Sequence, residues 1–226
     1  MRFFNGPKLL RSLVSGSKEV AIVVVTALVL SSLIRILLVQ AFYIPSASME
    51  TTLMTNDKII VSKVATRLDG VRRGDVVVFV DPGGWLGEIT PTPGIRGQLQ
   101  RVLTFVGFLP ANMGEHLVKR AIGIPGDTIK CCDDGKLVVN GQVIDEPHIQ
   151  LPTNDVSFDV TVPAGYVFVM GDNRPNSRDS RYQLDNGAFG AVPIKNVVGR
   201  VFGIIWPLDR ISRVTNPDLY RDLDPK

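Results

Sequence analysis

A single apolar run near the N-terminus restricts the folds open to this chain more than any other feature. Fifteen residues, Val20–Ile34, carry no charge, and the apolar pattern resumes after Arg35 as Ile36–Val39. At 1.5 Å per residue, a helix over this stretch spans about 30 Å, the thickness of a bilayer's hydrocarbon core. The pattern therefore predicts a transmembrane anchor over residues 19–40.

The charges before this run set the expected orientation of the anchor. Four basic residues and no acidic residue precede Glu19. The positive-inside rule then keeps residues 1–18 in the cytoplasm and places the rest of the chain outside the cytoplasmic membrane, as a single-pass protein. Two other interpretations stay open, a cleaved secretory signal ending near Ser46-Ala47-Ser48 and a buried core helix.

Past the anchor, the pattern changes to short β-branched runs separated by turn residues. Residues 41–208 are therefore expected to form a mainly β domain with a mostly antiparallel sheet. The Asn140-Gly141 pair is a strong signal for a two-residue hairpin turn. The expected strands are Lys58–Val64, Asp75–Val80, Leu117–Ile122, Leu137–Val139, Val143-Ile144, Val156–Val162, Tyr166–Val169 and Val197–Ile205.

Two segments depart from this regular pattern. Residues 81–115 are an expected insertion, in which Gln98–Phe108 has helical spacing and either faces the core or dips into the membrane interface. Residues 209–226 form a charged C-terminal tail that is expected to lie over the surface or fray.

Composition excludes several classes of protein. The net charge of +3 gives no basic stripe for nucleic acid, and only His116 and His148 are available for a histidine-based metal site or triad. No metal or other cofactor is expected. Cys131 and Cys132 are neighbours, which is not the pattern of a disulfide scaffold. Two unpaired thiols, a vicinal disulfide and an intermolecular bond all remain open.

The first candidate site segment lies where the chain leaves the anchor. Ser46 and Ser48 stand two residues apart after Pro45, and Met49 follows directly. Serines often cap helices, so this segment alone would support an ordinary capping role as well as a nucleophile.

The second segment is the expected strand Leu117–Ile122. Alternation puts Lys119 on a face with small or apolar neighbours and sends His116 to the opposite face, as a bystander. Holding a lysine neutral near pH 7 requires about 4.6 kcal/mol of discrimination against its charged form, which burial can supply. A neutral Lys119 is a general base. A lysine that reaches solvent from the strand edge is the ordinary alternative.

The third segment, Met170–Arg181, packs turn residues among acids and arginines after a strand. Asp179 and Arg181 are spaced for a local ion pair, which contributes little if it is exposed. The same loop can also form the wall of a site and orient a catalytic side chain.

Together the three segments resemble bacterial type I signal peptidases, which are membrane-anchored Ser/Lys endoproteases. The resemblance covers nearly the whole chain. Its motifs are Ile44-Pro45-Ser46-x-Ser48-Met49, Arg73-Gly74-Asp75-Val76-Val77, Lys119-Arg120-x-x-Gly123-x-Pro125-Gly126-Asp127, Gly171-Asp172-Asn173-Arg174-x-Asn176-Ser177-x-Asp179-Ser180-Arg181, Gly199-Arg200 and Trp206-Pro207.

The resemblance implies a role for each matching residue. Ser48 matches the nucleophile and Lys119 the general base, while the Ser46 hydroxyl and the Ser48 N–H would stabilise the oxyanion. Ser177 would bond to the Lys119 amine and orient it. The residues that would support this loop are Asp179, Arg181, Asp172 and Arg174.

The resemblance also implies the substrate. The chain would cut N-terminal signal peptides from secreted preproteins after Ala-x-Ala sequences, through an acyl-enzyme, as a monomer on the phospholipid membrane. Shallow pockets for small residues at the −1 and −3 positions would be lined by Phe42, Ile44, Pro45, Met49, Leu53 and Val118.

One departure and two alternatives accompany this expectation. Many members of the family have Met-x-Pro-Thr-Leu where this chain has Met49-Glu50-Thr51-Thr52-Leu53, which alters the turn but removes no catalytic group. A membrane-tethered peptide-binding module without catalysis would share the anchor and the sheet. A peptidase of the same family with a specialised substrate would share the motifs as well.

Overall fold

A long N-terminal helix leads into a body of antiparallel strands. The computed structural model describes residues 6–86, 116–149, 151, 156–185, 187–220 and 223. Its helices are α1 (Gly6–Leu37) and α2 (Lys63–Asp69), and its strands are β1 (Val39–Tyr43), β2 (Lys58–Ser62), β3 (Val76–Val80), β4 (His116–Gly123), β5 (Thr128–Asp133), β6 (Lys136–Val139), β7 (Gln142–Val143), β8 (Phe158–Thr161), β9 (Tyr166–Met170), β10 (Val192–Pro193), β11 (Val197–Trp206) and β12 (Ser212–Arg213).

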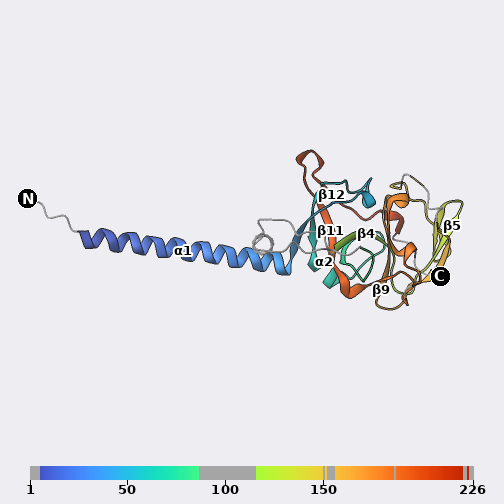
Figure 1. The fold of residues 1–226 in the computed structure, drawn as a ribbon, viewed down its shortest axis with the longest axis horizontal. Coiled ribbons are helices and arrows are strands. Elements are labelled where there is room, and N and C mark those ends of the chain that lie inside the picture. Colours follow the sequence, from blue (N-terminus) through green and yellow to red (C-terminus); the bar gives the residue numbers. More distant parts are fainter. Residues whose placement is uncertain are drawn as a thin grey trace, which may run out of the picture.

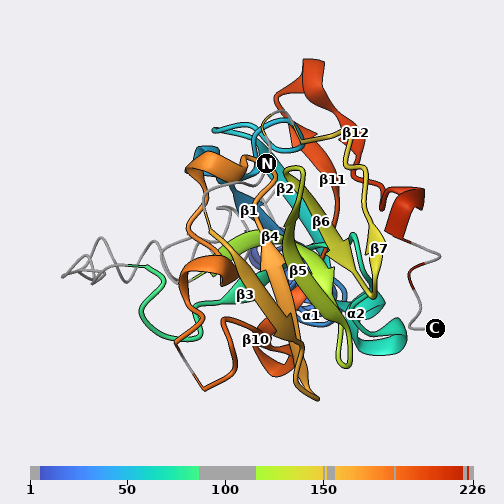
Figure 2. The same cartoon turned by 90° about the vertical axis from the view of Figure 1, so that its right-hand side faces the viewer.

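The strands pair into two sheets. Within the described residues, the larger sheet has eight strands in the order β1-β2-β11-β3-β4-β9-β10, with β12 paired to β11, and the smaller has four in the order β7-β6-β5-β8. Neighbouring strands run antiparallel, for example β3 with β4 and β4 with β9. The prediction of a mainly β, antiparallel fold is confirmed. Figure 2 looks onto the smaller sheet, with β5 in front of β4.

Helix α1 projects from the β body as a rod, and β1 continues the chain from its end (Figure 1). Its apolar side chains are exposed at many positions, including Val20, Val23, Val29 and Leu33. Among the helices in the described part of the chain, none is both long and apolar enough to cross a membrane. The transmembrane anchor expected over residues 19–40 is therefore not confirmed.

Strand β4 lies inside the larger sheet and carries the expected lysine. It pairs with β3 on one side, Val77 opposite Lys119, and with β9 on the other. Its side chains alternate between two apolar clusters, since Val118 packs with Phe42 and Ile59, while Leu117 packs against the cluster around Phe79. A strand paired on both sides and covered on both faces excludes water from the side chains it carries.

The local sequence predicts the turns better than the element ends. Asn140 and Gly141 both have positive φ, +52° and +78°, as a two-residue hairpin turn requires, and they join β6 to β7. The run Lys58–Val64 was expected to be one strand. Instead β2 ends at Ser62, whose hydroxyl accepts a bond from the Ala65 N–H and starts α2.

The expected insertion and tail have different outcomes. The helix expected over Gln98–Phe108 lies outside the described residues. The tail does not fray throughout, because Tyr220 and Leu223 are buried in the cluster beside the smaller sheet. The Asn140 amide also donates a hydrogen bond of 2.5 Å to the Leu223 carbonyl. The free energy gained by burying these two side chains outweighs the tendency of the charged residues around them to keep the segment in solvent.

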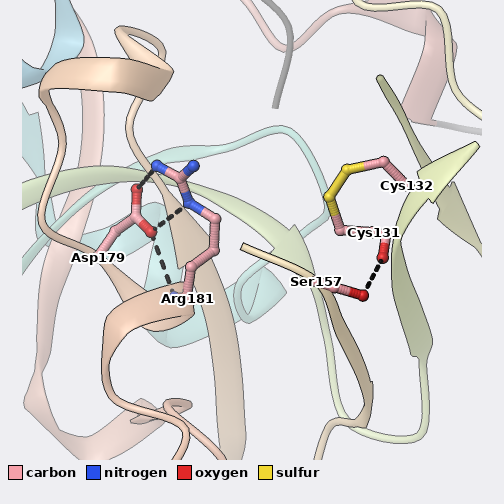
Figure 3. The surroundings of a disulfide bond; sticks show 5 residues. All are labelled: Cys131, Cys132, Ser157, Asp179 and Arg181. Atoms are coloured by element: carbon pink, nitrogen blue, oxygen red, sulfur yellow. Dashed lines mark hydrogen bonds and ion pairs between the residues drawn. A yellow bond between two sulfur atoms is a disulfide. The ribbon is translucent and has the colours of Figure 1, made fainter. Parts of the chain in front are cut away.

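Cys131 and Cys132, whose state the sequence left open, form a vicinal disulfide (Figure 3). They lie near the end of β5, where Cys131 is buried and Cys132 is exposed. The Ser157 hydroxyl donates a hydrogen bond of 3.3 Å to the Cys131 carbonyl. Of the three states left open, the structure therefore has the vicinal disulfide, and not free thiols or an intermolecular bond.

Candidate active site

The segment after β1 carries both candidate serines on a short 3-10 helix, Ala47–Met49. Ser46 is the N-cap residue of this helix in its backbone conformation, but its side chain makes no capping bond. Met49 is buried, and its carbonyl accepts bonds from the N–H groups of Thr52 and Leu53. The helix is thus held by its buried end, and the Ser46 hydroxyl is not consumed by a cap.

Ser48 and Lys119 meet although 71 residues separate them. Lys119 Nζ lies 2.5 Å from Ser48 Oγ, within hydrogen-bond distance. Lys119 is only 2% exposed, whereas Ser48 is partly exposed. A neutral lysine at this distance is placed to accept the hydroxyl proton, and Ser48 is not fully buried.

Burial sets the protonation of this lysine. Desolvation is the main cause that lowers the pKa of Lys119, from 10.5 to about 8. The carboxylates of Asp179 and Asp172 oppose this by favouring the ammonium form, while Arg181 adds to the lowering. A general base works best when its pKa lies near the working pH, and burial brings the pKa of Lys119 closer to that range.

The Ser46 hydroxyl adjoins the pair. Ser46 Oγ lies 3.5 Å from Ser48 Oγ, and Ser46 is exposed. His116, three residues before Lys119, packs its ring against Phe42 with centroids 5.2 Å apart. This contact agrees with the expected assignment of His116 to the other face of the strand.

The loop after β9 forms a buried wall next to these residues. Asp179 and Arg181 make the expected ion pair, with Arg181 Nε 2.8 Å from Asp179 Oδ1, and Figure 3 shows the carboxylate and guanidinium facing each other. Both side chains are fully buried, so this pair is not the weak exposed pair of a solvated loop. The Ser177 hydroxyl donates to Asp179 at 2.7 Å, where the resemblance had implied a bond to Lys119.

A second buried ion pair ties β4 to the same loop. Arg120, next to Lys119, binds Asp172 through Nε at 2.8 Å and Nη2 at 2.6 Å. The Thr52 hydroxyl also donates to Asp172, at 2.5 Å. Although burial disfavours its charge, the bonds from Arg120 and Thr52 lower the pKa of Asp172. These bonds join three parts of the chain: strand β4 with Lys119, the segment that follows Ser48, and the loop after β9.

A third buried ion pair, between Arg174 and Glu146, holds the loop in place. Arg174 Nη2 lies 2.7 Å from Glu146 Oε1, and Arg174 Nε donates to the Gly171 carbonyl at 3.0 Å. Glu146 also accepts a hydrogen bond from the Tyr220 hydroxyl. Tyr220, buried in the C-terminal tail, therefore supports through Glu146 the loop that carries Asp172 and Ser177.

Most of the apolar side chains expected to line substrate pockets pack together, and one of them, Met49, follows Ser48 directly. They share one buried cluster, whose relevant members are Phe42, Ile44, Met49, Leu53 and Val118. Pro45 is exposed and stands apart from this cluster. Through Met49, this cluster forms the floor under the end of the Ser46–Met49 segment.

Two neighbours of Ser48 received no role from the sequence. A Cβ atom on Gly171 would lie 2.4 Å from the Ser48 carbonyl oxygen and 2.1 Å from Ser177 Oγ, so the loop approaches the nucleophile as closely as a glycine allows. Asn173 binds the backbone on both sides of Ser48. Their only sequence signal was membership of the Gly171-Asp172-Asn173 motif.

Acidic, histidine and cysteine side chains form no cluster of three that could hold a metal ion anywhere in the described ranges.

Comparison with known proteins places this arrangement in a family. The profile described as "Signal peptidase, peptidase S26" matches residues 17–206. The chain is 36% identical over 229 residues to a signal peptidase I of Mycobacterium tuberculosis, covering 90% of this chain and 78% of that protein. It is 34% identical over 214 residues to a signal peptidase I of Leptolyngbya laminosa, covering 95% and 90%.

A solved structure of a signal peptidase I from Enterococcus faecalis matches a smaller part of this chain than these two relatives do. It is 27% identical and covers 57% of this chain and 95% of its own, with a TM-score of 0.37. That score is too low to support a structural argument, and the family assignment rests on the sequence matches. The chain belongs to the S26 family of signal peptidases.

Proposed function

We propose that this chain is a serine endopeptidase that removes signal peptides from preproteins, with Ser48 as nucleophile and Lys119 as general base. The 2.5 Å contact between Lys119 Nζ and Ser48 Oγ, on a lysine that is 2% exposed, carries the proposal. A serine hydroxyl is a weak nucleophile without an adjacent base, and a desolvated amine supplies one.

The proposed reaction proceeds through an acyl-enzyme. Ser48 Oγ attacks the scissile carbonyl carbon while its proton passes to Lys119 Nζ. The ammonium then returns a proton to the leaving amine of the mature protein, and the signal peptide stays esterified to Ser48. Water, deprotonated by the neutral amine, hydrolyses this ester and frees the serine.

Two groups near Ser48 Oγ are proposed to stabilise the tetrahedral oxyanion. They are the Ser48 N–H and the Ser46 hydroxyl, which makes no capping bond and lies 3.5 Å from Ser48 Oγ. Loss of one such donor typically costs about 10²–10³ in rate. In this scheme the buried Ser177, Asp179 and Arg181 hold the wall that faces the lysine.

The packed cluster that contains Met49 supports a preference for small residues at the −1 and −3 positions, before the cut. Phe42, Ile44 and Val118 are packed with Met49, the residue after the nucleophile, in one buried cluster. A small side chain at the −1 position fits over such a floor without displacing it, whereas a large one forces it to repack. This favours substrates of the Ala-x-Ala type.

We further propose that residues 19–40 anchor the chain in the cytoplasmic membrane, with residues 1–18 in the cytoplasm and the β domain outside. The support is the uncharged stretch Val20–Ile34, its exposed apolar side chains and the basic residues before it. The anchor would deliver Ser48 to the membrane surface, where the apolar segment of a signal peptide also lies. Ser48 and Lys119 come from one chain, so a monomer suffices.

The test is cleavage of a preprotein whose signal ends in Ala-x-Ala by the full chain in detergent. Ser48→Ala and Lys119→Met should abolish cleavage, while Lys130→Met, on an exposed lysine paired with Asp159, should retain it. Undiminished cleavage by either site variant would refute the dyad. A folded wild type that binds the preprotein without cutting it would favour the peptide-binding module.

A further inference from the structure

The peptide unit between Ala47 and Ser48 is fixed by two donors. The Ala47 carbonyl accepts a bond of 3.0 Å from the Asn173 side-chain amide and another of 3.0 Å from the Glu50 N–H. The N–H at the other end of this unit belongs to Ser48. The bond from Asn173 crosses 126 residues of sequence and joins the loop after β9 to the nucleophile segment.

Because the peptide group is rigid, the bonds to the Ala47 carbonyl also fix the direction of the Ser48 N–H. A peptide unit is planar, and in the trans form its C=O and N–H point in opposite directions. Ala47–Ser48 is not among the cis bonds of the described chain. Holding the Ala47 oxygen toward Asn173 therefore aims the Ser48 N–H away from Asn173.

The orientation of the Asn173 amide is itself determined by its surroundings. Its nitrogen faces the Ala47 carbonyl at 3.0 Å and Glu50 Oε2 at 3.4 Å. Both neighbours are acceptors, so the NH₂ group and not the amide oxygen must face them. The Asn173 backbone N–H binds the Ser48 carbonyl at 3.1 Å, which fixes the next peptide unit as well.

Buried charges hold Asn173 in place. The residue before it, Asp172, is paired to Arg120, and the residue after it, Arg174, is paired to Glu146. Asn173 therefore does not rely on its own contacts with Ala47 and Ser48 for its position. It links a rigid ion-pair framework to the peptide that carries the nucleophile.

We propose that Asn173 is a positioning residue that aims the Ser48 N–H at the oxyanion of the reaction proposed above. It touches neither the substrate nor the reacting atoms, and acts through the Ala47–Ser48 peptide unit. Without it, the Glu50 N–H is the one donor to the Ala47 oxygen that remains among the described residues, and the peptide plane can rotate. Because a lost oxyanion donor costs about 10²–10³ in rate and a misaimed one costs less, kcat should fall about 10- to 100-fold.

The experiment compares Asn173→Ala and Asn173→Asp with Asn196→Ala in full-length protein. Asn173→Asp keeps the shape of the side chain but has no N–H to donate, so it serves even if the alanine variant does not fold. Asn196 is a matched control, because its amide donates to the Val80 carbonyl, a backbone bond of the same kind on the far side of β3. The readouts are kcat, KM and the pH midpoint of cleavage, with a peptide aldehyde ending in Ala-x-Ala as a probe of the oxyanion site.

Both Asn173 variants should lower kcat with little change in KM, and they should weaken aldehyde binding by a similar factor. The pH midpoint should stay unchanged in Asn173→Ala, which adds no charge, whereas the new carboxylate of Asn173→Asp favours the ammonium form of Lys119 and should raise it. Asn196→Ala should change none of these. Unchanged kcat and aldehyde affinity would overturn the proposal. So would a rise in KM alone, or a shifted pH midpoint in Asn173→Ala, because either one indicates general disruption of the site. If wild type does not cleave, or Ser48→Ala still cleaves, the proposed function itself fails.

Discussion

Protonation of Lys119 should control the rate of cleavage below pH 8. The lysine must be neutral to accept the Ser48 proton, so activity should rise with pH and level off above the pKa. With a pKa of about 8, the neutral fraction is about 1% at pH 6, about 10% at pH 7 and about half at pH 8. With the ordinary pKa of 10.5, the neutral fraction at pH 7 would be only about 0.03%.

The assay is kcat/KM for cleavage of a preprotein between pH 5.5 and pH 10, in detergent at constant ionic strength. The substrate should have no titratable side chain next to the cleaved bond, so that the profile reports on the enzyme. Circular dichroism at each pH verifies that the protein stays folded. We expect a tenfold rise per pH unit up to about pH 7.5 and a plateau above about pH 9.

Two results would refute the reasoning. A profile that is flat from pH 6 to pH 8 would show that no base titrates there. A rise that continues to a midpoint near 10.5 would show that burial does not shift Lys119 as the structure indicates.

Three substitutions test the architecture around the pair. Gly171→Ala places a Cβ 2.4 Å from the Ser48 carbonyl oxygen, and because a 1 Å misplacement can cost about 10²-fold, kcat/KM should fall by that order in a folded protein. Thr51→Pro restores the proline of many family members, but Thr51 has φ +88° and proline requires about −65°, so denaturant unfolding should reveal a loss of more than about 1 kcal/mol; unchanged stability would contradict this backbone conformation. Asp179→Asn leaves Arg181 as a buried charge without its carboxylate, so the free energy of unfolding should fall by about 3–5 kcal/mol, and a loss under 1 kcal/mol would argue against the buried pair.

The sequence predicted the parts of this fold that depend on local pattern. The Asn140-Gly141 turn follows from the left-handed φ that these residues tolerate, and the strand around Lys119 follows from β-branched and apolar alternation. The boundary at Ser62 was missed, because Lys63 and Val64 continue the strand pattern until the Ser62 cap starts a helix.

Features that depend on distant contacts were beyond local pattern. Tyr220 and Leu223 sit in a charged stretch whose composition favours the surface, yet they complete a core built mainly from the smaller sheet. Similarly, the motif identified Asn173 without a role, because its partner Ala47 lies 126 residues away. The Ser177 bond to Asp179 shows a different limit, since the two residues are neighbours in the motif but the motif does not determine which acceptor the hydroxyl binds.

Formation of a covalent bond at Ser48 Oγ tests the central claim most directly. The measurement mixes the full-length protein with the p-nitrophenyl ester of an N-acetylated Ala-x-Ala peptide, quenches it in acid and locates the acyl group by mass spectrometry. An activated ester makes acylation fast, so the acyl-enzyme accumulates with a burst of p-nitrophenol. The account predicts an adduct on the peptide that contains Ser48 in wild type, and neither adduct nor burst in Ser48→Ala; an adduct on another residue, or an undiminished burst in Ser48→Ala, would contradict it.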